Sequence, residues 1–120
     1  MKARRNKGKQ LLPRFRVVCG EDIALGPGKA ELLELIDKTG SISEAARQMG
    51  MSYNRAWLLT NAMNECFKAP VVVPLRGGAA GGGAGLSETG RRALKMYRQL
   101  EQQSLKASAE TWDELQNLLR

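Results

Sequence analysis

The sequence predicts a mainly α-helical domain with one small β-hairpin, and three observations support this. Residues 41–57 have the pattern of two short helices joined by a tight turn at Gly50. Apolar residues recur at helical spacing on either side of this pair, over 29–38 and 87–119. A valine run at 71–73 is followed by a glycine-rich segment and a second extended stretch. Three helices with such a hairpin make a winged helix-turn-helix, here with a long C-terminal helix.

Length and composition narrow the class of protein. The chain has 120 residues, of which 42% are hydrophobic, enough for one modest core. We place one domain at 14–120 and treat 1–13 as a basic flexible tail. Two distant cysteines and no histidine leave no zinc site and no Cys/His nucleophile, so we expect no metal, no cofactor and no enzymatic activity.

The apolar segments of the sequence indicate where in the cell the protein is found. No run of about 18 apolar residues occurs, so no membrane-spanning helix is expected. The stretch LLPRFRVV is too short and too interrupted by proline and arginine to be the core of a signal peptide. We therefore expect a cytoplasmic protein that does not contact membranes.

The net charge of +7 is unevenly distributed. Residues 1–16 carry +7, residues 17–40 carry −3, residues 41–98 carry +5 and residues 99–120 carry −2. The basic middle segment contains the helix pair, which favours a phosphate-rich partner over a membrane. We expect the Lys and Arg residues of 2–16 to add non-specific attraction to nucleic acid. A terminus that only improves solubility is the alternative.

Composition also predicts the elements before the helix pair. Phe15–Cys19 is aromatic and β-branched enough for a strand, and a second extended piece is expected near 23–25. Pro27 suits the first turn of a helix, where its missing N–H is not needed. The helix over 29–38 ends at Gly40 and braces the pair that follows.

Both helices of the pair have start signals. Ser41 and Glu44 have the S-x-x-E spacing of a capping box, with Ser43 as a competing cap. Ser52 can cap the second helix, and Gly50 takes positive φ at the turn without steric cost. The buried wedge between the helices is expected to consist of Ala45, Ala46, Met49, Met51, Ala56 and Leu59.

The second helix, over about 52–67, is expected to be buried on two sides and to present its first turns outward. Its outward residues are Tyr53, Asn54, Arg55, then Trp57 or Leu58, and Asn61. Asn pairs well with adenine, and Arg with guanine or phosphate. We expect Asn54 and Tyr53 to read bases, and Arg55 and Arg47 to hold phosphates or a guanine. An ordinary αα-corner with a solvated polar face is the alternative. The candidate DNA-binding residues of the pair are Ser43, Arg47, Ser52, Tyr53, Asn54, Arg55 and Trp57.

The segment RGGAAGGGAG has glycine at six of its ten positions. A P-loop needs G-x-x-x-x-G-K-[ST], but Gly78–Gly83 is followed by Ala and Gly, so no nucleotide site is predicted. We expect a wing over about 71–86 whose tip, at Arg76, Gly77 and Gly78, meets the DNA backbone or minor groove. A linker without contacts is the alternative.

The last segment has apolar residues at 3-4-3-4 spacing. One helix over about 87–119 spans roughly 45 Å, more than the domain needs to cover its core, so we expect it to dimerise. A break near 104–108, with the end folding back on its own domain, is the alternative. The apolar seam consists of Leu105, Trp112, Leu115 and Leu119, interrupted by Ser108.

Three motifs, ALGPGKAELLELI, TGSISEAARQMGMSYNRAWLL and GGAAGGGAGLSETGRR, resemble the N-terminal DNA-binding domain of the molybdate-responsive ModE regulators. The resemblance covers roughly 14–100 and combines an S-Y-x-x-A-W recognition helix with a glycine-rich wing. It implies a winged helix-turn-helix homodimer on an inverted-repeat operator in double-stranded DNA. Members of the family control genes for molybdate uptake and molybdenum enzymes.

The chain departs from the family pattern in two ways. Family members usually append tandem molybdate-binding domains, for which this chain has no room, so we expect no effector domain of its own. The wing has Ala79-Ala80 where the family often has a Lys or Arg between its glycines. A winged-helix protein-interaction module, or an accessory subunit that pairs with a full-length molybdate regulator, is the alternative function.

Overall fold

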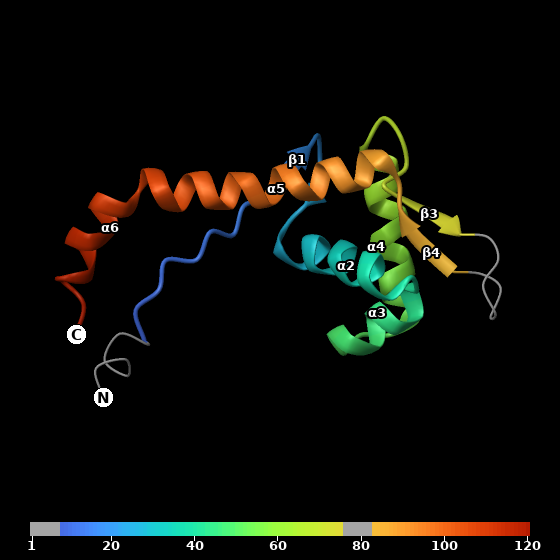
Figure 1. Cartoon of the computed structure of the whole chain (residues 1–120), viewed down its shortest axis with the longest axis horizontal. Coiled ribbons are helices and arrows are strands. Elements are labelled where there is room, and N and C mark those ends of the chain that lie inside the picture. The colour runs from blue at the N-terminus through green and yellow to red at the C-terminus, as the bar shows by residue number, and fades with distance from the viewer. Residues whose placement is uncertain (1–7, 76–82) are drawn as a thin grey trace.

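The computed structural model describes residues 8–75 and 83–120, and these are mainly helical (Figure 1). The helices are α2 (Pro27–Thr39), α3 (Ile42–Met49), α4 (Tyr53–Cys66), α5 (Glu88–Ala107) and α6 (Ala109–Gln116). Two antiparallel two-stranded sheets accompany them: β1 (Val17–Cys19) with β2 (Asp22–Leu25), and β3 (Val72–Leu75) with β4 (Gly83–Leu86). The predicted class, a winged helix-turn-helix followed by C-terminal helical structure, is confirmed.

The turn between α3 and α4 has the predicted local chemistry. Gly50 adopts φ 71°, in the left-handed region, and its N–H donates to the Arg47 carbonyl at 3.1 Å. The Ser52 hydroxyl accepts from the Arg55 N–H at 3.1 Å and so caps α4. The Ser41 hydroxyl accepts from the Glu44 N–H at 2.9 Å and caps α3.

The second half of the predicted capping box is wrong. The Ser41 N–H donates to the Thr39 hydroxyl at 3.2 Å, where a capping box would place the Glu44 carboxylate. Thr39 can do this because it ends α2 just two residues before the cap. The Glu44 side chain is thereby free to turn to its own helix.

The predicted wedge forms the centre of the core. Ala45, Ala46 and Ala56 are fully buried against α2, which contributes Leu32, Leu33 and Ile36. Small side chains at the crossing let the helix backbones approach closely. Met49, Met51 and Leu59 are partly buried and pack against this cluster, as expected.

The expectation that α4 is buried on two sides is wrong. Its buried residues are Ala56, Thr60 and Met63, which lie on one face, whereas Leu58 is 53% exposed. The reason is the path of α5, which packs on α2 and leaves the far face of α4 uncovered (Figure 1).

The strands of the wing are tied to the helices at their base. The Asn64 side chain on α4 accepts from the N–H groups of Val71 and Val72 at 2.8 and 3.0 Å, and donates to the Val72 carbonyl at 3.1 Å. On the other strand, the Ala84 N–H donates to the carbonyl of Gly40, between α2 and α3, at 3.0 Å. Hydrogen bonds from Asn64 of α4 to one strand, and from the loop between α2 and α3 to the other strand, therefore set the position of the wing.

The single helix expected over 87–119 is two helices, with the break at Ser108. This residue has φ −98° and ψ 5°, and its hydroxyl donates to the Ser104 carbonyl at 2.6 Å. Such back-bonding to the preceding turn bends helices. The helices α5 and α6 together form an arm that extends from the domain, and α6 lies at its end, far from α3 and α4 (Figure 1). The predicted alternative is therefore correct about the break but wrong in expecting the end of the chain to fold back on its own domain.

The first half of α5 is fixed to the domain. The buried Tyr97 side chain donates its hydroxyl to the Phe15 carbonyl at 2.8 Å. The strand β1 starts at Val17 rather than at the predicted Phe15, because its partner β2 ends at Leu25, opposite Val17, just before α2. Arg98 pairs with Glu34 of α2 at 2.8 Å and with Glu101 at 2.9 Å. These hydrogen bonds, first that to Glu34, raise the pKa of the Arg98 guanidinium.

Among the described residues, none of the helices combines the length and the apolar character needed to cross a membrane.

Candidate nucleic-acid interface

The first turns of α4 present their polar side chains to solvent. Tyr53 and Trp57 are 53% and 44% exposed, and Asn54 and Arg55 are exposed between them. Because Ala56 and Thr60 are buried, the helix cannot rotate to hide this face without opening the core. All four predicted residues are therefore exposed in the first turns of α4.

The two candidates on α3 behave differently from each other. Ser43 is exposed at the first turn, but Arg47 is engaged in an ion pair with Glu44 on the same helix. The Arg47 Nε donates to Glu44 Oε1 at 3.0 Å, and Gln48 donates to the other carboxylate oxygen at 3.2 Å. These hydrogen bonds, that of Arg47 foremost, lower the pKa of Glu44 from 4.5 to about 2. A carboxylate that stays ionised thus sits beside a side chain proposed to hold phosphate.

A groove of about 320 Å³ separates α4 from the base of the wing. Its walls come from three parts of the chain: the start of α3, the exposed side of α4, and both strands of the wing. Sequence reasoning did not foresee the groove, since no local pattern reports the distance between α4 and β3. Among the residues that line it are Ser43, Tyr53, Trp57, Asn61, Pro74 and Ala84.

A buried hydroxyl lies without a partner beside this groove. Thr60 is 5% exposed, and among the described residues its Oγ1 forms no hydrogen bond. Burying an unsatisfied hydroxyl is unfavourable, so Thr60→Val is expected to raise the free energy of unfolding by about 1 kcal/mol. Thermal unfolding followed by circular dichroism measures this.

The matched control for that substitution is Thr39→Val. The Thr39 hydroxyl donates to the Leu35 carbonyl at 2.7 Å and accepts from the Ser41 N–H, so the control is expected to destabilise the fold. A loss of stability in Thr60→Val equal to that of the control would contradict the assignment.

The remaining candidates, Arg76, Gly77 and Gly78 at the tip of the wing, lie outside the described residues. Of the ten predicted positions, the structure therefore describes the seven on the helix pair. Ser52 serves as the cap of α4, and its side chain is exposed beside Tyr53.

Comparison with known proteins adds to this geometry. No protein-family model matches the chain. It is 40% identical over 92 residues to "Molybdenum transport protein ModE" of Azotobacter vinelandii, covering 77% of this chain and 34% of that protein. It is also 40% identical over 81 residues to "DNA-binding transcriptional dual regulator ModE" of Escherichia coli K12, covering 68% and 31%. The chain is homologous to the N-terminal part of the ModE regulators.

The homology confirms the resemblance inferred from the three motifs. A further relative, "Molybdenum-pterin-binding protein MopB" of Rhodobacter capsulatus, is 46% identical over 77 residues, covering 64% of this chain and 28% of that protein. The chain thus spans about a third of the length of these ModE and Mop relatives.

Proposed function

We propose that this chain is a sequence-specific regulator of transcription of the ModE type that binds double-stranded DNA as a homodimer. The observation that carries the proposal is the exposed face of α4, where Tyr53, Asn54, Arg55 and Trp57 project from a helix locked by its buried side. An α-helix of this kind fits the major groove, where base edges differ in their donors and acceptors. The homology to ModE regulators supports it. A cytoplasmic location is part of the same proposal.

In this proposal the candidate residues divide into two roles. Asn54 and Tyr53 read base edges, whereas Arg55 and Arg47 hold phosphates or a guanine. Ser43 and Ser52 lie at helix starts, where N–H groups and hydroxyls suit phosphate oxygens. The wing tip, with Arg76, Gly77 and Gly78, contacts the backbone or the minor groove.

Selection of bound sequences from a random duplex pool tests the function. The expected result is an enriched palindrome whose half-sites lie about one helical turn apart, because each subunit inserts one α4. An enriched sequence without symmetry would reject the homodimer but keep DNA binding. No enrichment, together with binding to a full-length molybdate regulator, would reject DNA reading and favour the accessory subunit.

The names of the relatives link them to molybdenum transport and molybdenum-pterin binding. We extend this to the chain as part of the proposal: its operator lies near genes for molybdate uptake or molybdenum enzymes. Locating the selected palindrome in the source genome checks this.

Glu44→Gln is expected to strengthen DNA binding about two- to fivefold, because it removes a carboxylate that competes with phosphate for Arg47. The low pKa of Glu44 means that the charge is present throughout the neutral range. The ion pair stabilises α3 fully above pH 4.5 and loses this effect as the pH falls toward 2. Fluorescence anisotropy at several salt concentrations measures the affinity.

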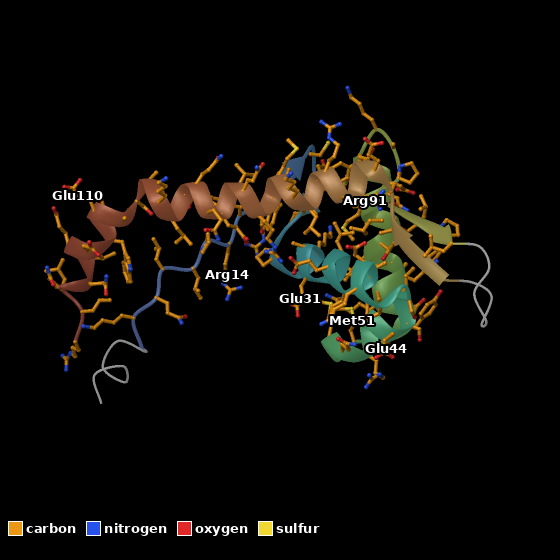
Figure 2. The ribbon with its side chains drawn as sticks, viewed as in Figure 1. Arg14, Glu31, Glu44, Met51, Arg91 and Glu110 are labelled. Carbon is orange, nitrogen blue, oxygen red and sulfur yellow. The ribbon has the colours of Figure 1, made fainter. Side chains whose placement is uncertain are left out.

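The control for this variant is Glu31→Gln, which makes the same change in net charge on α2, a different helix from that of Glu44 (Figure 2). An equal gain in affinity for the control would show that net charge alone is responsible. No gain for Glu44→Gln would place Arg47 away from phosphate.

A further inference from the structure

The groove between α4 and the base of the wing has the properties of a small-molecule site. Its volume of about 320 Å³ falls in the range of roughly 300 to 1,000 Å³ typical of such sites. No Lys, Arg, Asp or Glu is among the described residues that line it, so these residues offer no charge to an ion. The lining mixes aromatic and aliphatic side chains with hydroxyls and carboxamides. The groove therefore suits an uncharged ligand that has both apolar surface and hydrogen-bonding atoms.

One face of α4 forms the first wall of the groove. Tyr53 and Trp57, near the start of the helix, are about half exposed, whereas Thr60 is buried. Aromatic side chains at the edge of a groove provide a surface on which a planar ring stacks. Polar groups deeper in the groove then meet the edge of that ring. The lining residues of this wall lie three or four positions apart, as one helix face requires: Tyr53, Trp57, Thr60, Asn61 and Asn64.

The Thr60 hydroxyl is the observation that points to a ligand. Thr39 and Ser108 donate their hydroxyls to the carbonyl four residues back, at 2.7 and 2.6 Å. Thr60 forms neither that hydrogen bond nor any other within the described residues, although it is only 5% exposed. Buried polar atoms normally have a partner. Because Thr60 lines the groove, a ligand bound there can supply the missing one.

The two carboxamides in the groove differ in their availability. The Asn64 side chain already holds the backbone of Val71 and Val72. The Asn61 side chain is exposed. A carboxamide presents an acceptor and a donor side by side, and these match the amino group and the N7 atom of an adenine ring. Asn61 therefore favours a purine edge over other uncharged ligands.

Hydrogen bonds hold the walls of the groove in place. Asn64 connects α4 to β3, and the Ala84 N–H connects β4 to the Gly40 carbonyl at 3.0 Å. Pro74 of β3 and Ala84 of β4 are paired in the sheet, so the two strands form one continuous wall beside α4 (Figure 1). A groove formed before the ligand arrives binds at little cost in reorganisation.

We propose that this groove binds a small uncharged purine, as the free base or its nucleoside. The ring stacks on Trp57, and its edge forms hydrogen bonds with Asn61 and Thr60. Because Tyr53 and Trp57 are also proposed to contact DNA, the bound purine competes with the operator. The competition rests on the proposed function, whereas the binding of the purine does not.

Fluorescence of Trp57 tests the binding, with adenosine as the probe. The chain has two tryptophans, so Trp112→Phe leaves Trp57 as the single emitter. In this background adenosine is expected to quench the emission saturably. Adding Thr60→Val is expected to weaken binding about three- to tenfold, and adding Asn61→Ala about tenfold or more. Since Thr60→Val is expected to stabilise the fold, its loss of binding would not reflect unfolding.

The matched controls make the same chemical changes at exposed positions outside the groove. They are Thr111→Val on α6 and Asn117→Ala just after it, and both are expected to bind adenosine normally. Adenosine monophosphate is the test of charge, and it is expected to bind no more tightly than adenosine.

Three results would overturn the proposed site. The first is the absence of saturable quenching. The second is equal affinity of Thr60→Val, Asn61→Ala and the unaltered residues, which would mean that adenosine only stacks on the exposed face of Trp57. The third is binding of adenosine monophosphate about tenfold tighter than that of adenosine, which would show that the site recognises phosphate.

Fluorescence anisotropy with the selected duplex tests the competition. Adenosine at ten times its dissociation constant is expected to weaken operator binding about tenfold, and the same concentration is expected to have a smaller effect on Thr60→Val. An operator affinity that adenosine leaves unchanged would reject the competition. If no duplex binds at all, the proposed function fails, but the quenching of Trp57 still reports on the groove, so the two failures are distinguishable.

Discussion

Arg55→Ala is expected to weaken binding to the selected operator by about 1 to 3 kcal/mol, which is roughly five- to 150-fold in affinity. Arg55 is exposed on α4 and, within the described residues, forms no ion pair, so its guanidinium is available to DNA. The cap of α4 uses only its backbone N–H, which alanine keeps. Alanine also favours a helix, so the fold should be unchanged. Fluorescence anisotropy with the selected duplex and with a scrambled one measures the affinity and the specificity.

The pattern of the loss separates the two roles open to Arg55. If it holds a phosphate, the selected and scrambled duplexes weaken equally and the salt slope falls by about 1. If it reads a guanine, binding to the selected duplex weakens more. Arg120→Ala, which removes an exposed arginine from the far end of the arm, is the control. Equal affinities of Arg55→Ala and the unaltered chain for the selected duplex would reject the assignment of α4 as the reading helix.

Gly90→Ala is expected to cause the largest loss of stability, about 3 kcal/mol, with a fall in melting temperature of roughly 10 °C. A Cβ at this third residue of α5 would lie 2.1 Å from the Val71 carbonyl oxygen and 2.9 Å from its carbon. The same carbonyl accepts from the Ser87 N–H at 3.0 Å. Val71 is also held by Asn64, so the clash cannot be relieved without breaking the connection between α4 and the wing.

Gly28→Ala is the matched control, because Gly28 also lies in the first turn of a helix but a Cβ there meets nothing within 4 Å. It is expected to be neutral or to stabilise by about 0.5 to 1 kcal/mol, since alanine reduces the freedom of the unfolded chain. Differential scanning calorimetry of both variants checks the pair. Similar melting temperatures for the two would mean that α5 can move away from Val71 at little cost.

Much of the helix pair could be predicted because its determinants are neighbours in the chain. Ser41 and Ser52 cap helices through N–H groups three residues away, and Gly50 takes its φ from its own lack of a Cβ. The ion pair between Glu44 and Arg47 is equally local and could have been found from its spacing. It was missed because the same spacing to Ser41 suggested a capping box, and that alternative is excluded only by Thr39.

The sequence by itself determined the winged helix-turn-helix class, the helix starts and the face of α4 that turns outward, because helical periodicity and caps act within a few residues. Tertiary structure alone decided that α4 is buried on one side, that Asn64 positions the wing, and that Gly90 must lie against Val71. These features join segments that are distant in the chain, and their distances depend on how the helices pack around the alanines of the wedge. A groove beside α5 belongs to the same group, because its walls come from the β1–β2 hairpin, the end of α4 and α5, which are distant in the chain.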